Sequence, residues 1–358
     1  MKTLVFILGT RPEAIKLAPV ILEAKKRGIF RIEVILSSQH PEMCIQTLQN
    51  FGINPTTTLE SFRDGQGLVS FSSKILGELS KLVLPWKESI VIVQGDTTTA
   101  TMGAYAGFLL EAKVVHVEAG LRTYERDPFP EELNRILISK LVSFHFCATE
   151  GNRLNLQSEG ILDEQIAVVG NTVVDAIKFF KVSRNLDVEK KSILITLHRR
   201  ENHKNIINET TRIIDELVSE SDPLYQWKFI KHPNPMAQAG YDSKFKLNSK
   251  IEFLDPVPYP KMLAELSKSY LVLTDSGGFQ EESSFLGIPT LVLRKTTERP
   301  EALLAGCCEL IAEPSKTLKA KVREILTNEV AHQKMSTPST AFGNGDSAAK
   351  ILQILTSF

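Results

Sequence analysis

Short apolar runs alternate with longer amphipathic stretches along almost the whole chain. In the first half, runs of aliphatic and β-branched residues predict strands over 3–8, 32–36, 90–94, 114–117, 144–148 and 165–169. Between most of them, apolar positions recur with a helical period and predict helices over 12–27, 41–51, 67–82, 98–110 and 131–141. Continuous apolar strands are typical of parallel strands covered on both faces. The rhythm therefore predicts a doubly wound α/β sheet.

A polar segment at 182–191 is predicted to be a linker, and the alternation of apolar runs and amphipathic stretches begins again after it. Further strands are predicted over 192–197, 227–231, 251–254, 271–274, 290–293 and 309–312. A polar loop at 336–346 then precedes a last amphipathic helix at 347–355. Two Rossmann-like doubly wound domains, 1–181 and 182–345, facing one another across a central cleft are the predicted architecture, with ligands at the carboxyl ends of both sheets.

Composition and charge limit the kinds of ligand to consider. A length of 358 residues fits about two domains of ordinary globular composition. Lys+Arg and Asp+Glu both number 42, so the formal net charge is zero. The whole-protein basic field typical of nucleic-acid binding is absent. An anionic ligand would therefore be held by a few local cations.

The sequence also favours a cytoplasmic location. No apolar stretch approaches the roughly 20 residues that a membrane span needs, so no membrane partner is expected. The apolar start resembles a signal peptide, but Arg11 and Pro12 stand where small cleavage-site residues would lie, and a buried first strand is predicted instead. The four cysteines lack metal or redox spacing and are expected to be free thiols.

Two turns between a strand and a helix have features of anion binding. The first carries Arg11 and Lys16 beside Pro12, which suits the first position of a helix. The second follows the strand at 271–274 and contains Ser276, Gly277 and Gly278, which would let a phosphate approach backbone amides. A third turn, with Arg299, would add a cation to a diphosphate-binding wall. Neither a dinucleotide fingerprint nor a P-loop is present in the sequence.

Acidic residues and a histidine follow other strands. Asp96 and Glu118 each end a strand, and Glu131 and Glu132 begin a helix. Carboxylates at neighbouring strand ends would converge and could transfer protons. Helix capping by Asp96 and helix-dipole pairing by Glu131 or Glu132 are the alternatives. His198 ends the first strand of the second half beside two arginines, and would reach a phosphate or a substrate oxygen.

Taken in order, these segments resemble the non-hydrolysing UDP-N-acetylglucosamine 2-epimerases almost from end to end. The matching pieces are GTRPEAIK (9–16), QGDTTT (94–99), HVEAGLRT (116–123), PFPEELNR (128–135), GNTVVDA (170–176), HRREN (198–202), DSGGFQEE (275–282) and TTERPEA (296–302). The resemblance implies the two-domain fold of one large glycosyltransferase class, GT-B. It also implies that a last helix, at about 346–358, packs back onto the first domain.

The resemblance further implies a reaction. UDP-N-acetylglucosamine and UDP-N-acetylmannosamine would interconvert without NAD or metal, by elimination of UDP to 2-acetamidoglucal and re-addition, supplying surface polysaccharide precursors. Asp96, Glu118 and Glu131 would be the acid–base set, with Glu131 or Glu132 as the last member, and His198 would lie at the leaving phosphate. The implied contacts to the nucleotide sugar are Arg11, Lys16, Ser276, Gly277, Gly278, Glu282 (at the ribose hydroxyls) and Arg299. Relatives are commonly homodimers.

Some bacterial relatives carry a second, activating substrate site. Gln39, Gln66 and His232 match it, whereas Pro41 and Gly65 depart from it. Met262 stands where many relatives place an aromatic residue beside the uracil. Four alternatives to the main prediction stay open: an epimerase for a 6-deoxy or diacetamido uronic sugar, a hydrolysing epimerase, a glycosyltransferase of the same architecture, and a silent nucleotide-sugar-binding protein.

Overall fold

The structure is a computed structural model that describes residues 1–37, 39, 41–60, 67–185, 189–197, 204–231 and 248–358. The chain divides into two compact units, one of Met1–Phe179 with Phe342–Phe358 and one of Phe180–Ala341. The change of unit thus falls two residues before the predicted 181/182 boundary. The return to the first unit begins at Phe342, inside the loop predicted over 336–346.

The first unit is built on a parallel sheet in the order β3-β2-β1-β4-β5-β6-β7. Its strands are β1 (Thr3–Leu8), β2 (Arg31–Leu36), β3 (Thr57–Thr58), β4 (Ser89–Gln94), β5 (Lys113–Ala119), β6 (Phe144–Cys147) and β7 (Ile166–Val168). Its helices are α1 (Arg11–Arg27), α2 (Pro41–Asn50), α3 (Gly67–Ser80), α4 (Thr98–Leu109), α5 (Glu131–Leu141), α6 (Glu150–Ser158), α7 (Thr172–Phe179) and α15 (Ser347–Thr356). Short 3₁₀ turns, η1 (Trp86–Glu88) and η2 (Asp163–Gln165), precede β4 and β7.

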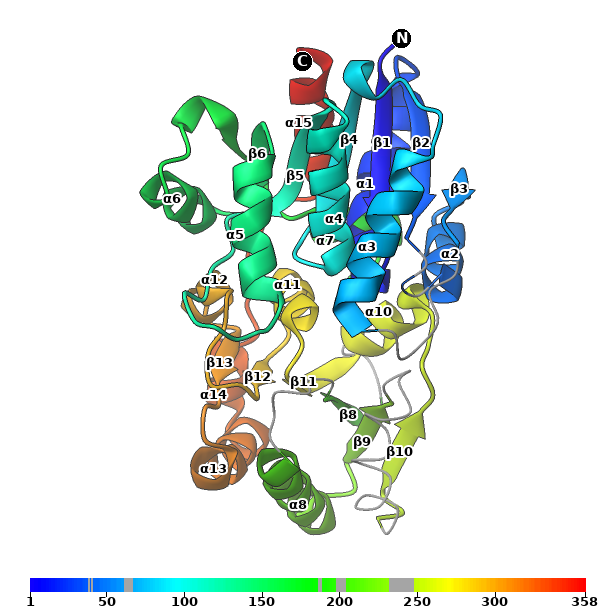
Figure 1. Cartoon of the computed structure of the whole chain (residues 1–358). Helices are drawn as coiled ribbons and strands as arrows, with labels where there is room; N and C mark the ends of the chain where they lie inside the picture. Colours follow the sequence, from blue (N-terminus) through cyan, green and yellow to red (C-terminus); the bar gives the residue numbers. More distant parts are fainter. Residues whose placement is uncertain (38, 40, 61–66, 186–188, 198–203, 232–247) are drawn as a thin grey trace. The chain divides into compact units, whose positions relative to one another are not determined.

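Helices cover both faces of this first sheet (Figure 1). Helix α4 packs between α3 and α5 on one face, and α1 packs against α7 and α15 on the other. Strands β1 and β4 are buried along their whole length, as expected of strands covered on both sides. One core cluster joins these strands to α3 and α4 through Val5, Ile7, Phe71, Val91 and Ala104.

The second unit repeats the same plan. Its parallel sheet has the order β10-β9-β8-β11-β12-β13, with β8 (Lys191–Thr196), β9 (Tyr225–Ile230), β10 (Ile251–Leu254), β11 (Ser269–Thr274), β12 (Thr290–Val292) and β13 (Cys308–Leu310). Its helices are α8 (Lys204–Glu220), α10 (Tyr259–Ser267), α11 (Gly277–Leu286), α12 (Pro300–Leu304), α13 (Pro314–Thr327) and α14 (Glu329–Lys334). Trp227, Phe229 and Leu271 lie in its core.

Strand order places the switch point of each sheet. In both units the first strand lies between the second and the fourth, which is the doubly wound order. The predicted fold class is therefore confirmed for both units. Ligands of such sheets bind outside the carboxyl ends of the strands where the winding reverses. In this chain these points are β1/β4 in the first unit and β8/β11 in the second.

Candidate active site

The β1–α1 turn lies at the switch point of the first sheet. Helix α1 begins at Arg11, with Thr10 as its N-cap and Pro12 in its first turn, as predicted. Only glycine fits at position 9, because a Cβ there would come 2.1 Å from Ser37 Oγ and 2.4 Å from Thr99 Oγ1. Arg11 is partly exposed at this turn.

Glu13 joins this turn to the one after β4. Its carboxylate accepts hydrogen bonds from the Gly9 amide (3.0 Å) and the Thr10 amide (2.7 Å). It also accepts one from Thr97 Oγ1, 2.7 Å away in the β4–α4 turn. Burial raises the pKa of Glu13 to about 7, in spite of these donors. The sequence analysis did not single out Glu13, although the T-x-x-E spacing of a capping box was there to find it.

Lys16 and Glu118 form a buried ion pair. Lys16 Nζ donates to Glu118 Oε2, and both side chains are at most 7% exposed. Asn171 Nδ2 donates to the same oxygen at 3.0 Å. Two residues expected at separate tasks, one binding the nucleotide sugar and one moving protons, are therefore in direct contact.

The backbone at Glu118 is strained. Its φ is +65°, in the left-handed region, where a non-glycine residue costs about 1–3 kcal/mol. The pairing of β5 with β6 shifts register at this point, between Val117 and Ala119. Such strain is concentrated at functional sites, which favours a chemical task for Glu118 over a merely structural one.

Asp96 directly follows Gly95 in the turn between β4 and α4, and an arginine from α5 holds its side chain. Arg135 Nε and Nη2 donate to Asp96 Oδ2 at 2.9 and 2.6 Å. The alternative in which Asp96 caps α4 is wrong, because Thr97 is the N-cap and accepts from the Ala100 amide at 2.9 Å. The Asp96 carboxylate is therefore positioned by a side-chain ion pair.

The two glutamates at the start of α5 have different surroundings. Glu132 is 3% exposed and accepts hydrogen bonds from the Thr123 and Tyr124 amides at 3.0 Å. Arg135 Nη1 donates to its other oxygen at 2.7 Å. Glu132 thus ties the 123–130 loop to α5, so we take Glu131 as the acid–base candidate of the two.

Two buried histidines lie beneath these groups, paired across β5 and β6. His116 Nε2 lies 2.7 Å from the Gly95 carbonyl oxygen, and His145 is its register partner. Burial lowers the pKa of His116 to about 4 and that of His145 to about 3. Both are therefore neutral near pH 7.

In the second unit, the β11–α11 turn carries the predicted Ser276-Gly277-Gly278 segment. Ser276 is the N-cap of α11, and its amide donates to Thr274 Oγ1 at 3.0 Å. A Cβ at position 277 would come 2.5 Å from Arg299 Nη1, so glycine lets the guanidinium approach the helix start. A Cβ at position 278 would meet only Ser276 Oγ, at 4.0 Å.

Arg299 is a buried cation with two carboxylate partners. Its Nε contacts Glu281 Oε1 at 2.5 Å, and its Nη1 contacts Glu298 Oε1 at 2.5 Å. Arg294 pairs with the same Glu298 at 2.8 Å. The two arginines are thus balanced by two carboxylates, which fix the Arg299 guanidinium beside the amino end of α11.

Glu282, one turn into α11, has a tyrosine partner. The hydroxyl of Tyr259 donates to Glu282 Oε1 at 2.9 Å, and Tyr259 is fully buried. Met262, which stands where many relatives place an aromatic residue beside the uracil, is 6% exposed and lies on the same helix α10. The Glu282 carboxylate is therefore oriented by a side chain that the sequence analysis did not assign.

Three candidates lie outside the described residues, namely His198, Gln66 and His232. Of the predicted regulatory positions, Gln39 is described, and its Oε1 accepts from Thr99 Oγ1 at 3.1 Å.

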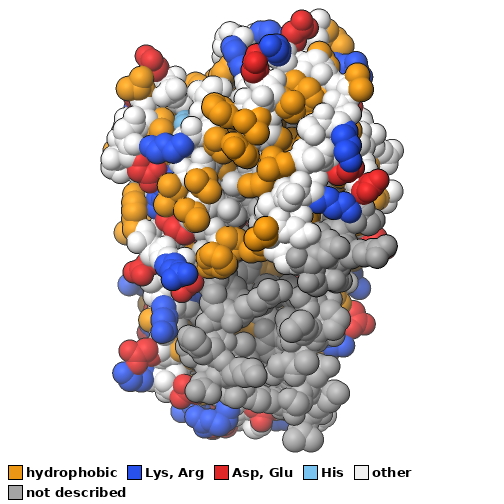
Figure 2. All heavy atoms as spheres, viewed as in Figure 1, with side chains coloured by type: hydrophobic (Ala, Val, Ile, Leu, Met, Phe, Trp, Pro, Cys, Tyr) orange, Lys and Arg blue, Asp and Glu red, His pale blue; other side chains and the backbone are white. Residues whose placement is uncertain are grey.

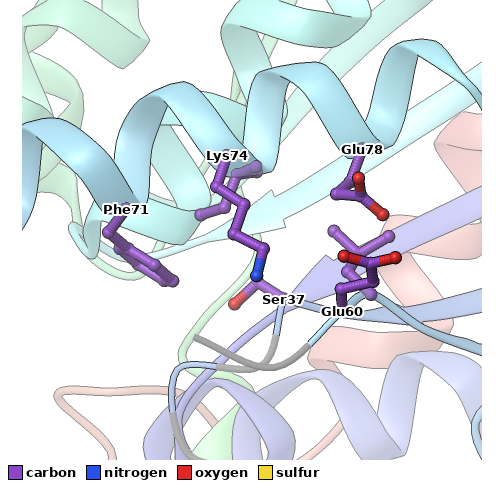
Figure 3. Close-up of a pocket in the computed structure, with 7 residues that line it drawn as sticks. Ser37, Glu60, Phe71, Lys74 and Glu78 are labelled. Carbon is purple, nitrogen blue, oxygen red and sulfur yellow. The ribbon is translucent and has the colours of Figure 1, made fainter. Parts of the chain in front are cut away.

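A shallow hollow opens beside Ser37, the residue that follows β2. It is lined by Ser37, Leu59, Glu60, Phe71, Lys74, Ile75 and Glu78. In Figure 3, the Lys74 side chain extends from α3 toward Ser37, with the carboxylates of Glu60 and Glu78 to one side. The hollow is lined by acidic, basic and apolar side chains together, so its lining does not by itself indicate a ligand.

All four cysteines are buried free thiols. Within the described parts of the chain, no helix is both long and apolar enough to cross a membrane.

The fold places the chain in the class of α/β enzymes built from two Rossmann-like units. A statistical model described as UDP-N-acetylglucosamine 2-epimerase matches residues 22–356. The chain belongs to the UDP-N-acetylglucosamine 2-epimerase family, and as an epimerase it is an isomerase. It is 38% identical to the enzyme of that name from Salmonella typhimurium, over 98% of each chain.

Solved structures agree with this assignment. A UDP-GlcNAc 2-epimerase from Neisseria meningitidis bound to UDP-GlcNAc is 36% identical, with a TM-score of 0.94 over 100% of both chains. The Methanocaldococcus jannaschii enzyme in complex with UDP-GlcNAc and UDP is 34% identical, with a TM-score of 0.86 over 99% of this chain and 100% of that one. The resemblance stated from the motifs is therefore confirmed.

Proposed function

We propose that this enzyme interconverts UDP-N-acetylglucosamine and UDP-N-acetylmannosamine by eliminating and re-adding UDP. The observation that carries the proposal is the set of carboxylates after β4, within β5 and at the start of α5, beside the switch point of the first sheet. Relatives solved with UDP-GlcNAc and UDP support the substrate class.

The C2 hydrogen of the sugar is a very weak acid, because only the acetamide neighbours it. A carboxylate can remove this proton only while the C1–O bond breaks and the electron pair leaves with UDP. A C1=C2 double bond forms, giving 2-acetamidoglucal. UDP then adds back at C1 as a proton reaches the opposite face of C2. Two faces require at least two proton-transfer groups, each worth about 10²–10⁴-fold in rate.

Asp96, Glu118 and Glu131 are proposed as these acid–base groups. Lys16 contacts Glu118 and Arg135 contacts Asp96, so each of these two carboxylates is held in place by a cationic side chain. His198 is proposed to act at the leaving phosphate.

The nucleotide is assigned mainly to the second unit. Ser276, Gly277 and Gly278 offer backbone amides at the amino end of α11, where an anion is favoured. Arg299 adds a fixed guanidinium beside them, and Glu282, oriented by Tyr259, is proposed to bind the ribose hydroxyls. Arg11 and Lys16 are proposed to contact the nucleotide sugar from the first unit.

We further infer a homodimer that meets through the exposed faces of α4 and α5. These helices pack side by side and expose the large apolar side chains Tyr105, Phe108, Leu109, Leu133, Ile136 and Leu137. Figure 2 shows hydrophobic side chains gathered over this part of the molecule. Since none of the six is charged, a second copy of the same face is a fitting occupant, as in two-fold symmetric dimers.

The deciding experiment is incubation of the purified chain with UDP-N-acetylglucosamine in deuterated water, followed by NMR. Deuterium at C2 of UDP-N-acetylmannosamine, with no net hydrolysis, is the expected result. Free UDP accumulating in step with free sugar would identify a hydrolysing enzyme instead. If UDP binds but neither product nor exchange appears, the test is repeated with 6-deoxy and diacetamido uronic UDP-sugars. Turnover only with an added acceptor would indicate a glycosyltransferase.

Two further proposals concern cellular context. Free, buried thiols support the expected cytoplasmic location. The product is an amino-sugar donor, so we place the reaction upstream of glycosyl transfer into surface polysaccharide.

A further inference from the structure

The segment from Gly170 to Ala176 has no role in the reaction proposed above, yet its side chains reach two distant parts of the first unit. Asn171 is 2% exposed and contacts Glu118 of β5. Asp175, one turn later, contacts the first residues of α15. These contacts lie far from one another in sequence, so the segment connects the candidate base to the end of the chain.

The orientation of the Asn171 amide is determined by its neighbours. Its Oδ1 accepts a hydrogen bond from the Val173 amide at 3.0 Å, at the start of α7. Its Nδ2 must therefore face the other way, where it donates to Glu118 Oε2 at 3.0 Å. An amide NH₂ only donates, and a donor to a carboxylate oxygen favours the ionised form of the acid, so this contact favours an ionised Glu118.

The backbone of Asn171 is held by the returning C-terminal segment. Its amide donates to the Phe342 carbonyl at 2.7 Å. Gly170 and Gly343 both have positive φ and approach so closely that a Cβ on Gly343 would come 3.0 Å from Gly170 Cα. Asp175 accepts from the Ser347 and Ala348 amides at 3.3 and 2.9 Å. The Phe342 carbonyl thus holds the residue that touches Glu118, whereas Asp175 holds the start of α15.

We infer that Asn171 is a positioning residue: it orients the Glu118 carboxylate and favours its ionised form, while the Phe342 carbonyl fixes its backbone amide. This inference rests on the proposed function for its kinetic consequence. The geometry does not depend on the proposed function: Glu118 has a strained backbone, and its Oε2 accepts hydrogen bonds from Lys16 and Asn171.

The test variant is Asn171→Ser, since a serine oxygen still serves as acceptor for the Val173 amide but is too short to reach Glu118. The matched control is Asp175→Asn, in α7 one turn after Asn171, because its partners are the amides at the start of α15. Asn171→Asp, which sets a second carboxylate against Glu118, is the fallback variant if the serine variant does not fold.

For Asn171→Ser we expect kcat to fall about 10- to 100-fold, the range of a lost hydrogen bond to a charged group. KM should change little, and the acidic limb of the kcat–pH profile should move to higher pH. Asp175→Asn should lower Tm but leave kcat and the profile unchanged. In a Glu118→Gln background, Asn171→Ser should have no further effect on rate.

A second measurement does not depend on turnover. With ¹³C-carboxyl-labelled glutamate, and the Glu118 signal assigned through Glu118→Gln, its titration midpoint should rise in Asn171→Ser, rise further in Asn171→Asp, and stay unchanged in Asp175→Asn. An unchanged Glu118 midpoint in both Asn171 variants would overturn the inference. So would a kcat loss shared equally by Asn171→Ser and Asp175→Asn and following Tm. A wild-type enzyme inactive on UDP-N-acetylglucosamine would refute the proposed function alone, because the carboxyl titration still decides the role of Asn171.

Discussion

The ammonium of Lys16 lies against the carboxylate of Glu118, although 102 residues separate them in the chain. Both side chains are almost completely buried. Breaking a buried pair by removing one partner typically destabilises a protein by about 3–5 kcal/mol, because the other charge is left uncompensated. The pair therefore links the stability of the first unit to its chemistry.

Substitutions at this pair should separate binding from turnover. We expect Glu118→Gln to lower Tm, because the buried Lys16 ammonium is left uncompensated. It should still bind the UDP-sugar yet lose most turnover, because the amide cannot accept the C2 proton. Lys16→Met should lose both stability and turnover. Thermal unfolding measures stability, calorimetry measures the affinity for the UDP-sugar, and C2 deuterium exchange measures turnover. Near-normal turnover in Glu118→Gln would remove Glu118 from the acid–base set.

The two glutamates that begin α5 form a natural comparison. Glu131→Gln should reduce turnover about 10²–10⁴-fold, as for a lost acid–base group, with little change in Tm. Glu132→Gln should lower Tm, since its carboxylate holds the Thr123 and Tyr124 amides and Arg135. Asp96→Asn should behave like Glu131→Gln in turnover while still binding the UDP-sugar. If the effects of the two glutamate variants were exchanged, Glu132 would be the acid–base residue.

Gly277 and Gly278 provide a matched pair for the nucleotide assignment. Gly277→Ala would bring a Cβ to 2.5 Å from Arg299 Nη1 and displace the guanidinium, whereas Gly278→Ala meets only Ser276 Oγ at 4.0 Å. UDP affinity, measured by calorimetry, should therefore fall much more in Gly277→Ala. Arg299→Ala should weaken it as well. Unchanged UDP binding in both Gly277→Ala and Arg299→Ala would contradict the proposal that the start of α11 and Arg299 bind the diphosphate.

Stability should depend on pH through groups buried beneath the site. His145 titrates near 6.5 when unfolded but has a pKa of about 3 in the fold, so the unfolded state binds more protons between these values. Its contribution to stability is therefore complete above pH 6.5 and is lost as the pH falls toward 3. Glu13, with a pKa of about 7 against 4.5, acts in the opposite direction and lowers stability as pH rises from 4.5 to 7.

Urea unfolding at a series of pH values tests both signs. In His145→Gln, the free energy of unfolding should fall less between pH 6.5 and 4 than in the wild type. In Glu13→Gln, the free energy of unfolding should rise more steeply between pH 4.5 and 6.5 than in the wild type, because the opposing contribution of Glu13 is removed. A wild-type slope retained in both variants would assign the pH dependence to other groups.

The proposed dimer face can be tested by placing a charge on it. Phe108 and Leu137 are 54% and 44% exposed. Phe108→Glu with Leu137→Glu should give monomers in analytical ultracentrifugation, because burying unpaired like charges in a two-fold contact is unfavourable. Val330→Glu, at an exposed apolar position of α14 in the second unit, is the control and should leave the mass unchanged. Dimers that survive the double substitution would place the contact elsewhere.

Much of the fold could be predicted from local pattern. The apolar runs at β1, β4, β5, β8 and β11 predict buried parallel strands, and Pro12 predicts the start of α1 within one residue. The short helix α6 was not among the predicted helices, because few of its residues are apolar, although Thr149 and Asn152 form a capping box at its start. Local sequence signals thus identify an element when its burial produces a run or period of apolar residues, or when a capping residue marks its start.

What the sequence by itself determined is the alternation of elements, the polar residues that follow each strand, and a motif order that places the chain in its family. Only the tertiary structure decided which of these residues meet. Arg135 holds Asp96 from 39 positions away, and Asn171 reaches Glu118 from 53. Periodicity records which face of a strand or helix is buried, whereas side-chain partners depend on which strands become neighbours. In a doubly wound sheet the crossover connections bring together residues that are far apart in the chain.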